Sequence, residues 1–237
     1  MKSQNNSAFK VVIFDLDGTL IDSIADIADC ANTVLNNHGF PTLSEERFKE
    51  LVGDGFANLT RKIIPPSELS AERVEQFTRE YRELYRERWH QRTTVYQGIH
   101  ELLRSLQSAS YTLCVLSNKR DEYTKLCVAR FFPDVRFAEI RGEQPGTPIK
   151  PAPDAALAIA ASCGAKPEEC VFVGDSEIDI ETGKRAGMTA VGVLWGFRPR
   201  ITLEHAGATA LISHPHELLA FVSSEPAPSE LCQDTCT

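Results

Sequence analysis

The sequence contains no run of about 18 apolar residues, so it predicts no membrane-spanning helix. Its start, MKSQNNSAFK, lacks the apolar stretch that a secretory signal needs. No internal repeat is visible along the chain. We therefore expect a cytoplasmic protein that does not associate with membranes.

Basic residues are in the minority. The chain has 25 Lys and Arg residues against 33 Asp and Glu residues, which gives a formal net charge of −8. Proteins that bind nucleic acids or anionic membranes in a general way need a basic face, so both are excluded as expected partners. If the ligand is an anion, local groups must attract it against the overall field of the protein.

Cysteine pairs of the C-x-x-C type are absent, although seven cysteines are present. The count is odd, and most of the cysteines lie in apolar segments such as TLCVL and ECVFVG. This pattern favours small buried hydrophobic side chains in a reducing compartment over disulfides. Cys232 and Cys236 could ligate a metal, but no histidine is near them, so we expect no site there.

Four short and nearly continuous apolar runs predict buried parallel strands, because strands covered on both faces need no polar alternation. The four runs are residues 11–14, 112–116, 170–173 and 190–194. Helical patterns separate them, and two of these patterns end at the glycines Gly164 and Gly187. The alternation predicts an α/β fold with a doubly wound parallel sheet, in which ligands bind beyond the carboxyl ends of the strands.

Residues 23–91 interrupt this alternation, because they contain several helical patterns and no convincing strand. Ser44 and Ser70 are placed to cap two of the helices. We infer an all-helical insertion, the cap, that two crossings near residues 21–23 and 92–96 join to the core. The expected division is a core of residues 1–22 and 92–224, a cap of residues 23–91, and a disordered tail of residues 225–237 that is rich in Ser, Pro and acidic residues.

Two aspartates, Asp15 and Asp17, stand at the end of the first strand, where their charges repel each other. A turn and a helix cap would explain one aspartate and Gly18. A cation site would explain both, because hard cations such as Mg²⁺ take carboxylate oxygens as ligands. Asp175 directly follows the third strand, and Asp179 would face back toward it on a helix that begins near residue 176. Alternatively, Asp175 caps that helix and Asp179 is solvated in its first turn.

Polar groups of other kinds follow two further strands. Ser117 and Asn118 come after the second strand, where they would either cap a helix or hold a phosphate oxygen through a hydroxyl and a backbone N–H. Lys150 stands between prolines in TPIKPAPD, which predicts a stiff extended segment. Most lysines are solvated surface groups, but one held rigidly at this edge of the sheet is suited to bind an anion.

Together these residues have the chemistry of a phosphatase. A phosphate monoester is a dianion that a carboxylate nucleophile repels, so its transfer depends on positioning and on positive charge, here from Mg²⁺ and Lys150. Asp15 would attack phosphorus and form an aspartyl-phosphate, while Ser117 orients the phosphate. Asp17, which we expect to hold a proton because another carboxylate is close, would protonate the leaving alkoxide and then deprotonate a water molecule.

Four motifs, DLDGT, SN, the lysine of KPAPD, and GDSEIDI followed by AGM, resemble in order the motifs of the haloacid dehalogenase superfamily, over residues 11 to about 195. The resemblance implies a Rossmann-like core with a helical cap inserted after the first motif. The resemblance implies Asp15 as the nucleophile and Asp17 as the acid and base. It implies that Mg²⁺ is bound by Asp15, the Asp17 carbonyl and Asp175, with Asp179 in or near the second shell of the metal. It also implies that the phosphate is contacted by Ser117, Asn118 and Lys150.

Within that superfamily, segments such as LVGDG, VLSNK and GVLWGFR resemble the phosphoglycolate phosphatase group. The expected partner is therefore a small phosphorylated metabolite, with 2-phosphoglycolate as the best candidate. The cap would set substrate choice, with its glycine turn at residues 53–55 and with Arg61 or Lys62 facing the site. Gly183 departs from the group, in which alanine is frequent at this position, and we expect it to cost some helix stability.

Several alternatives stay open. A phosphosugar mutase, or a phosphatase for sugar phosphates, nucleotides or pyrophosphate, would use the same residues. A dehalogenase would need neither Asp17 nor Mg²⁺, and a phosphonate-cleaving relative would need a cap lysine such as Lys49 or Lys62. A regulatory module that only binds phosphate would be expected to have lost a catalytic group, and all are present. The sequence does not reveal whether the chain is a monomer or a homodimer.

Overall fold

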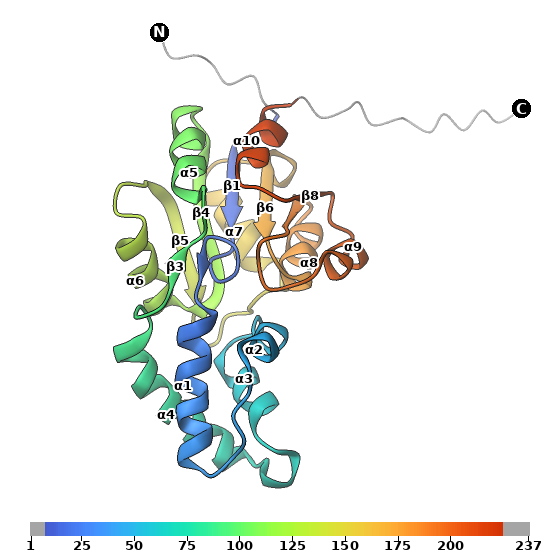
Figure 1. The fold of residues 1–237 in the computed structure, drawn as a ribbon. Coiled ribbons are helices and arrows are strands. Elements are labelled where there is room, and N and C mark those ends of the chain that lie inside the picture. Colours follow the sequence, from blue (N-terminus) through green and yellow to red (C-terminus); the bar gives the residue numbers. More distant parts are fainter. Residues whose placement is uncertain (1–7, 225–237) are drawn as a thin grey trace, which may run out of the picture.

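The structure is a computed structural model that describes residues 8–224, so the predicted tail of residues 225–237 lies outside the described residues. Its centre is a six-stranded parallel sheet with the strand order β5-β4-β1-β6-β7-β8 (Figure 1). The strands are β1 (Val11–Phe14), β4 (Thr112–Arg120), β5 (Phe137–Glu143), β6 (Cys170–Gly174), β7 (Thr189–Val193) and β8 (Ala210–Ile212). β1 is central, because Val12 lies opposite Leu113 of β4 on one side and Val171 of β6 on the other.

Helices cover both faces of this sheet (Figure 1). They are α5 (Ile99–Ser108), α6 (Asp121–Phe131), α7 (Asp154–Ser162), α8 (Glu177–Arg185), α9 (Arg200–Ala206) and α10 (His216–Ser223). Val12 and Phe14 of β1 belong to the hydrophobic cluster that includes α5, α6 and α10, whereas Val11 and Ile13 belong to a second cluster with α7. Successive side chains of a strand point to opposite faces, so these two clusters confirm the doubly wound α/β class.

All four predicted strands are present, but two neighbours of the predicted strands were missed. β5 has the sequence FAEIRGE and is only partly buried, so it has no continuous apolar run. β8 has only 3 residues, which is too short for a pattern. β4 also continues beyond its apolar run to Arg120, so Ser117 and Asn118 lie within the strand and do not cap α6, whose N-cap residue is Arg120.

Four helices lie beyond the carboxyl ends of the strands (Figure 1), and we call them the cap helices. They are α1 (Ile24–Asn37), α2 (Glu45–Leu51), α3 (Phe56–Ile63) and α4 (Ala71–Arg88), with a 3₁₀ turn at Pro66–Glu68. Both predicted serine caps are confirmed: the hydroxyl of Ser44 accepts from the N–H of Arg47 at 3.2 Å, and that of Ser70 from the N–H of Arg73 at 3.1 Å. Such caps satisfy N–H groups that the first turn of a helix leaves free.

The two chain crossings between sheet and cap helices lie side by side. β2 (Ile21–Asp22) and β3 (Thr94–Val95) pair there in antiparallel fashion, a ribbon that the sequence pattern did not reveal. The buried carboxylate of Asp26 accepts from the N–H of Arg92 at 2.9 Å and from the N–H and hydroxyl of Thr93 at 2.8 and 2.6 Å. One side chain of α1 therefore fixes the return path of the chain.

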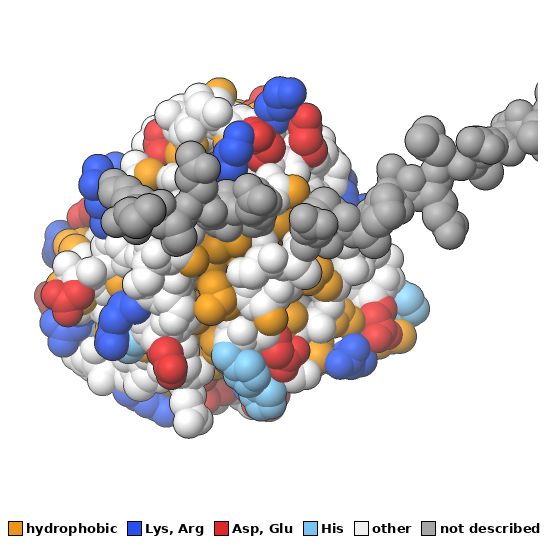
Figure 2. All heavy atoms as spheres, turned by 90° about the horizontal axis from the view of Figure 1, so that it is seen from above, with side chains coloured by type: hydrophobic (Ala, Val, Ile, Leu, Met, Phe, Trp, Pro, Cys, Tyr) orange, Lys and Arg blue, Asp and Glu red, His pale blue; other side chains and the backbone are white. Residues whose placement is uncertain are grey.

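Figure 2 views the end of the molecule opposite the cap helices. Acidic and basic side chains are interspersed on the visible part of this face, and hydrophobic side chains gather near its middle. No helix within residues 8–224 is both long enough and apolar enough to cross a membrane. The cysteines of the same region are free thiols, four of them buried, as the sequence predicts.

Candidate active site

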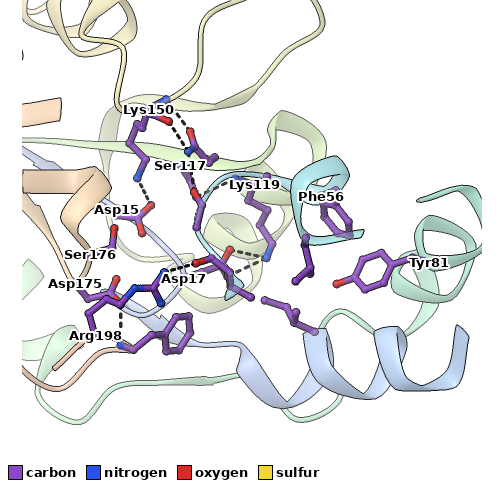
Figure 3. A pocket seen from close by; sticks show the side chains of 17 residues that line it. Asp15, Asp17, Phe56, Tyr81, Ser117, Lys119, Lys150, Asp175, Ser176 and Arg198 are labelled. Atoms are coloured by element: carbon purple, nitrogen blue, oxygen red, sulfur yellow. Dashed lines mark hydrogen bonds and ion pairs between the residues drawn. The ribbon is translucent and has the colours of Figure 1, made fainter. Parts of the chain in front are cut away.

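The structure brings the seven predicted site residues together at the carboxyl ends of β1, β4 and β6. Six of them line one cavity, which has a volume of about 60 Å³ between the strand ends and the cap helices (Figure 3). These six are Asp15, Asp17, Ser117, Asn118, Lys150 and Asp175. The seventh, Asp179 of α8, is fully buried next to them. Residues more than 150 positions apart in the sequence therefore meet because parallel strands end at one edge of the sheet.

Three buried carboxylates form the negative centre of this site. Asp15, Asp175 and Asp179 each place one carboxylate oxygen within 4.8 Å of the others. Burial raises the pKa of Asp15 from its ordinary 3.8 to about 7, and the charges of Asp179 and Asp17 add to this rise. Burial, together with Asp179 and Asp15, also raises the pKa of Asp175 well above its ordinary value. Clustered oxygen donors that repel one another fit a hard divalent cation.

Lys150 is the cation that the protein itself supplies to this centre. Its ammonium is buried and lies 2.6 Å from Asp15 Oδ1 and 2.6 Å from Asp179 Oδ1. Burial alone would lower the pKa of Lys150, but the two carboxylates outweigh it and raise that pKa, so the side chain stays charged. The chain turns here, with the N–H of Ala152 donating to the carbonyl of Ile149, instead of forming the expected stiff extended segment.

Asp179 is held by the first turn of α8. Its Oδ2 accepts from the N–H of Ser176 at 3.1 Å and from the hydroxyl of Ser176 at 2.6 Å, while its own N–H donates to that hydroxyl. Ser176, not Asp175, is thus the N-cap residue of α8, and the alternative of a solvated Asp179 is wrong. Both oxygens of Asp179 have donors, because Lys150 takes Oδ1. This arrangement suits a residue that holds Lys150 and the start of α8 in place next to the cation site.

The loop after β1 approaches Asp175 closely. Asp175 accepts from the hydroxyl of Thr19 at 3.0 Å and from the N–H of Phe197 at 2.8 Å. Gly18 has a positive φ of +88°, and a Cβ atom there would lie 2.3 Å from Asp175 Oδ2. A glycine is therefore required at this position by both backbone conformation and space.

Asp17 contacts donors instead of a second carboxylate. The ammonium of Lys119, a buried residue of β4, lies 2.9 Å from both oxygens of Asp17, and the hydroxyl of Ser23 donates to Oδ1 at 2.6 Å. Burial would lower the pKa of Lys119, but Asp17 outweighs it and raises that pKa. The expectation was that a neighbouring carboxylate keeps a proton on Asp17. Instead, the groups that hydrogen-bond to Asp17 are an ammonium and a hydroxyl.

Ser117 and Asn118 point to opposite sides of β4 and differ in their contacts. The hydroxyl of Ser117 accepts from the N–H of Lys119 at 3.3 Å and donates to no residue within 8–224, so its proton is available to a ligand. The side chain of Asn118 instead connects two loops. It accepts from the N–H of Lys150 at 2.9 Å and donates to the carbonyls of Lys150 at 3.0 Å and Gly53 at 2.8 Å. Asn118 thus positions Lys150 against the glycine turn of the cap helices.

The cap side of the cavity is apolar except for the hydroxyl of Tyr81. Its other lining residues are Ile27, Val52, Gly53, Gly55, Phe56 and Leu59. Arg61 and Lys62, which were expected to face the site, do not line it. Arg61 donates to Asn58 at 2.9 Å, and Lys62 pairs with Asp54 at 2.8 Å. Charge on the wall of the cavity therefore comes from the sheet side.

Four residues of the site were not identified from the sequence, although they stand inside the motifs DGT, VLSNK, GDSE and GVLWGFR. They are Thr19, Lys119, Ser176 and Arg198. Arg198 lines the cavity, lies 3.1 Å from Glu177 Oε2, and donates to the backbone carbonyls of Val52, at 2.7 Å, and Lys49. It therefore joins the sheet side to the end of α2.

Comparison with known proteins agrees with this geometry. A family model described as haloacid dehalogenase-like hydrolase matches residues 12–193. A phosphoglycolate phosphatase of Chromobacterium violaceum is 33% identical over 202 residues, which is 84% of this chain and 91% of that protein. An N-acetylmuramic acid 6-phosphate phosphatase of Pseudomonas aeruginosa is 29% identical over 211 residues, 89% of this chain and 93% of that protein.

A solved structure extends the likeness to three dimensions. A predicted phosphoglycolate phosphatase from Haemophilus somnus superposes with a TM-score of 0.85 at 27% sequence identity, over 91% of this chain and 99% of that chain. The match therefore covers the sheet, its flanking helices and the cap helices together. The chain belongs to the haloacid dehalogenase-like hydrolases and, within them, to the phosphoglycolate phosphatase-like group.

Proposed function

We propose that the protein is a Mg²⁺-dependent phosphatase that hydrolyses a small phosphate monoester, with 2-phosphoglycolate as the best candidate, through an aspartyl-phosphate on Asp15. One observation carries the proposal. Oδ1 of Asp15 is held by Lys150, whereas Oδ2 receives no hydrogen bond from any residue within 8–224, and Asp15 lines the cavity. A nucleophile needs such an arrangement, with one oxygen fixed and the other free to react.

The first step is attack of Asp15 Oδ2 on phosphorus, which breaks the bond to the leaving oxygen. Lys150 offsets the charge of the phosphate, and the free proton of Ser117 orients one of its oxygens. Asp17, whose carboxylate accepts from Lys119 and Ser23, takes up a proton from solvent when the substrate binds and transfers it to the leaving oxygen. In the second step Asp17 takes a proton from a water molecule, which attacks the phosphorus and releases phosphate from Asp15.

A divalent cation bound by Asp15 and Asp175, with Asp179 behind them, would supply further positive charge to the phosphate. The raised pKa values of Asp15 and Asp175 support this part of the proposal, because they indicate negative charge that Lys150 alone does not balance. Oxygen-only donors suit Mg²⁺. We further propose that the core and the cap helices are separate domains, and that the cap domain selects the substrate.

The cavity supports a small leaving group. Its volume of about 60 Å³ corresponds to roughly four to six water molecules, since one water needs about 10–15 Å³ on this measure. This volume favours a phosphate on a short acid over a larger ester such as an N-acetyl amino sugar phosphate, the kind of substrate for which the Pseudomonas relative is named. The apolar cap wall also leaves most sugar hydroxyls without partners, which disfavours sugar phosphates.

The test is phosphate release from 2-phosphoglycolate, a generic aryl phosphate, sugar phosphates, nucleotides and pyrophosphate, each with Mg²⁺ and with EDTA. We expect turnover only with Mg²⁺, the highest kcat/KM on 2-phosphoglycolate, and no turnover by an Asp15→Asn variant whose circular dichroism is unchanged. Turnover near the parent level in that variant would refute Asp15 as nucleophile. Equal rates with EDTA would refute the metal requirement.

A further inference from the structure

Tyr81 of α4 carries a hydroxyl that has no hydrogen-bond partner among the residues that the structure describes. The side chain is only 3% exposed, and its hydroxyl oxygen is buried without a hydrogen bond within residues 8–224. Figure 3 shows this hydroxyl directed into the cavity that Asp15 and Asp17 also line. A buried polar group without a partner destabilises a protein, so a hydroxyl that faces a cavity in this way is suited to a ligand.

The position of Tyr81 is fixed by aromatic packing. Its ring stacks on Tyr85 with 5.5 Å between centroids and 14° between planes, and Phe56 packs edge-on against it at 4.4 Å. The hydroxyl is therefore presented rigidly. It is also the one side-chain polar atom that the cap side contributes to the described cavity wall, because Ile27, Phe56 and Leu59 are apolar.

Lys119 supplies positive charge to the same cavity. Its ammonium forms two of its hydrogen bonds with the oxygens of Asp17 and lies 5.1 Å from the centroid of the Tyr85 ring, against which Tyr81 stacks. An ammonium has a further N–H beyond those two, and Lys119 lines the cavity, so this N–H can be donated to a ligand. A hydroxyl donor and an ammonium on one cavity together favour an anionic oxygen acceptor over a neutral group.

We propose that Tyr81 and Lys119 bind the carboxylate at the far end of the leaving group, and that Tyr81 is the cap residue that makes the enzyme selective for short phosphorylated acids. This inference rests on the proposed function and names its specificity determinant. The sequence suggested that a cap arginine faces the site, but Arg61 does not line the cavity, so the inference assigns this role to Tyr81. The hydrocarbon part of the acid would contact Ile27, Phe56 and Leu59.

The experiment compares Tyr81→Phe with the wild type on 2-phosphoglycolate and on ethyl phosphate, which lacks the carboxylate. We expect kcat/KM for 2-phosphoglycolate to fall by about 10- to 100-fold, the effect of losing one hydrogen bond to a charged group, with ethyl phosphate changed by less than about two-fold. Tyr85→Phe is the matched control. Its hydroxyl is equally buried and unpartnered, but Tyr85 does not line the cavity, so its selectivity should equal that of the wild type.

A binding measurement separates recognition from turnover. In an Asp15→Asn background, 2-phosphoglycolate should raise the melting temperature less when residue 81 is Phe than when it is Tyr. Without ligand, both Tyr→Phe variants should melt at or above the temperature of their parent, because each loses an unsatisfied buried hydroxyl.

The outcomes are distinguishable. A wild type that hydrolyses ethyl phosphate but shows no preference for 2-phosphoglycolate overturns the proposed substrate, and the carboxylate site with it. A wild type that prefers 2-phosphoglycolate, with the same preference in Tyr81→Phe, overturns the inference and leaves the proposed function standing. Equal loss on both esters in Tyr81→Phe also overturns it, because a residue with only a structural role acts in that way.

Discussion

Replacement of Asp15 by asparagine should make the protein inactive and, in the absence of metal, more stable. The wild-type side chain is only 10% exposed and shares its site with the carboxylates of Asp175 and Asp179. Asparagine has nearly the same shape and keeps an oxygen that can accept from Lys150. The substitution therefore removes a charge and changes little else.

The magnitude follows from the pKa of Asp15, which burial raises from 3.8 to about 7. The folded protein therefore binds this proton more tightly than the unfolded chain does. Stability is highest below pH 4 and is lost as the pH rises through 7, by at most about 4 kcal/mol at about 1.4 kcal/mol per pH unit. The attraction of Lys150, which lowers the pKa of Asp15, is already contained in this value. We expect Asp15→Asn to be more stable than the wild type by at most about 4 kcal/mol at pH 8.

The assay is urea unfolding followed by circular dichroism at pH 5 and pH 8, in EDTA. The gain of Asp15→Asn should be clearly larger at pH 8 than at pH 5, because the wild type loses about 1.4 kcal/mol for each pH unit between about 4 and 7. Asp134→Asn, the same chemical change at an exposed position, should have no effect at either pH. A variant no more stable than the wild type at pH 8, or equally stabilised at both pH values, would show that Asp15 is not strained by its buried neighbours.

Three further substitutions test other parts of the site. Asp17→Asn should lower kcat by about 10²- to 10⁴-fold yet keep Mg²⁺ affinity in calorimetry, because the proposed ligand is its backbone oxygen. Gly18→Ala should lower the free energy of unfolding by more than about 2 kcal/mol in urea titration, since its Cβ would lie 2.3 Å from Asp175 Oδ2 at a φ of +88°. Arg198→Gln should speed amide hydrogen exchange at the end of α2, because the carbonyl of Val52 loses its donor. Exchange unchanged there would contradict a link between sheet and cap helices.

The sheet centre could be predicted from the sequence because burial on both faces leaves a plain signal. β1 and β6 lie inside the sheet and consist almost entirely of apolar residues. β5 lies at the edge of the sheet, and its polar residues Glu139, Arg141 and Glu143 form a mixed pattern. Edge strands need less apolar surface, so composition alone does not separate them from loops.

The acidic part of the site was also predictable, because each acid stands within three residues of a strand end or in the first turn of a helix. Lys119 left a weaker signal: it stands two residues after Ser117 in β4, and residues two apart in a strand share a face. Tyr81 could not have been found, since its spacing within α4 is that of an ordinary core residue. Whether such a tyrosine buries its hydroxyl in a core or presents it to a cavity depends on the partner helices.

Gly183 shows how a helix-only view misleads. Glycine weakens a helix, which is the cost expected from the sequence. In the structure, a Cβ atom at this position would lie 3.0 Å from the Cβ atoms of both Ala190 and Phe172. The glycine therefore lets α8 lie close to β6 and β7. An alanine here would have the higher helix propensity. To make room for its Cβ atom, however, β6 and β7 would have to move by a few tenths of an ångström.

Buried groups without partners are concentrated where the cap helices face the sheet. Among residues 8–224, four buried side-chain polar atoms lack a hydrogen bond, and three of them belong to Asp54, Tyr81 and Tyr85. Apart from the fourth atom, Nδ1 of His90, the other buried side-chain polar atoms of this part of the chain have partners, as the three donors to Asp26 show. The strained aspartates and the free hydroxyl of Tyr81 thus share one cavity. A single ligand with an anionic phosphate and a carboxylate could engage Lys150 at one end and Tyr81 at the other. Its binding would then offset the free-energy cost of the buried carboxylates and of the unpartnered hydroxyl.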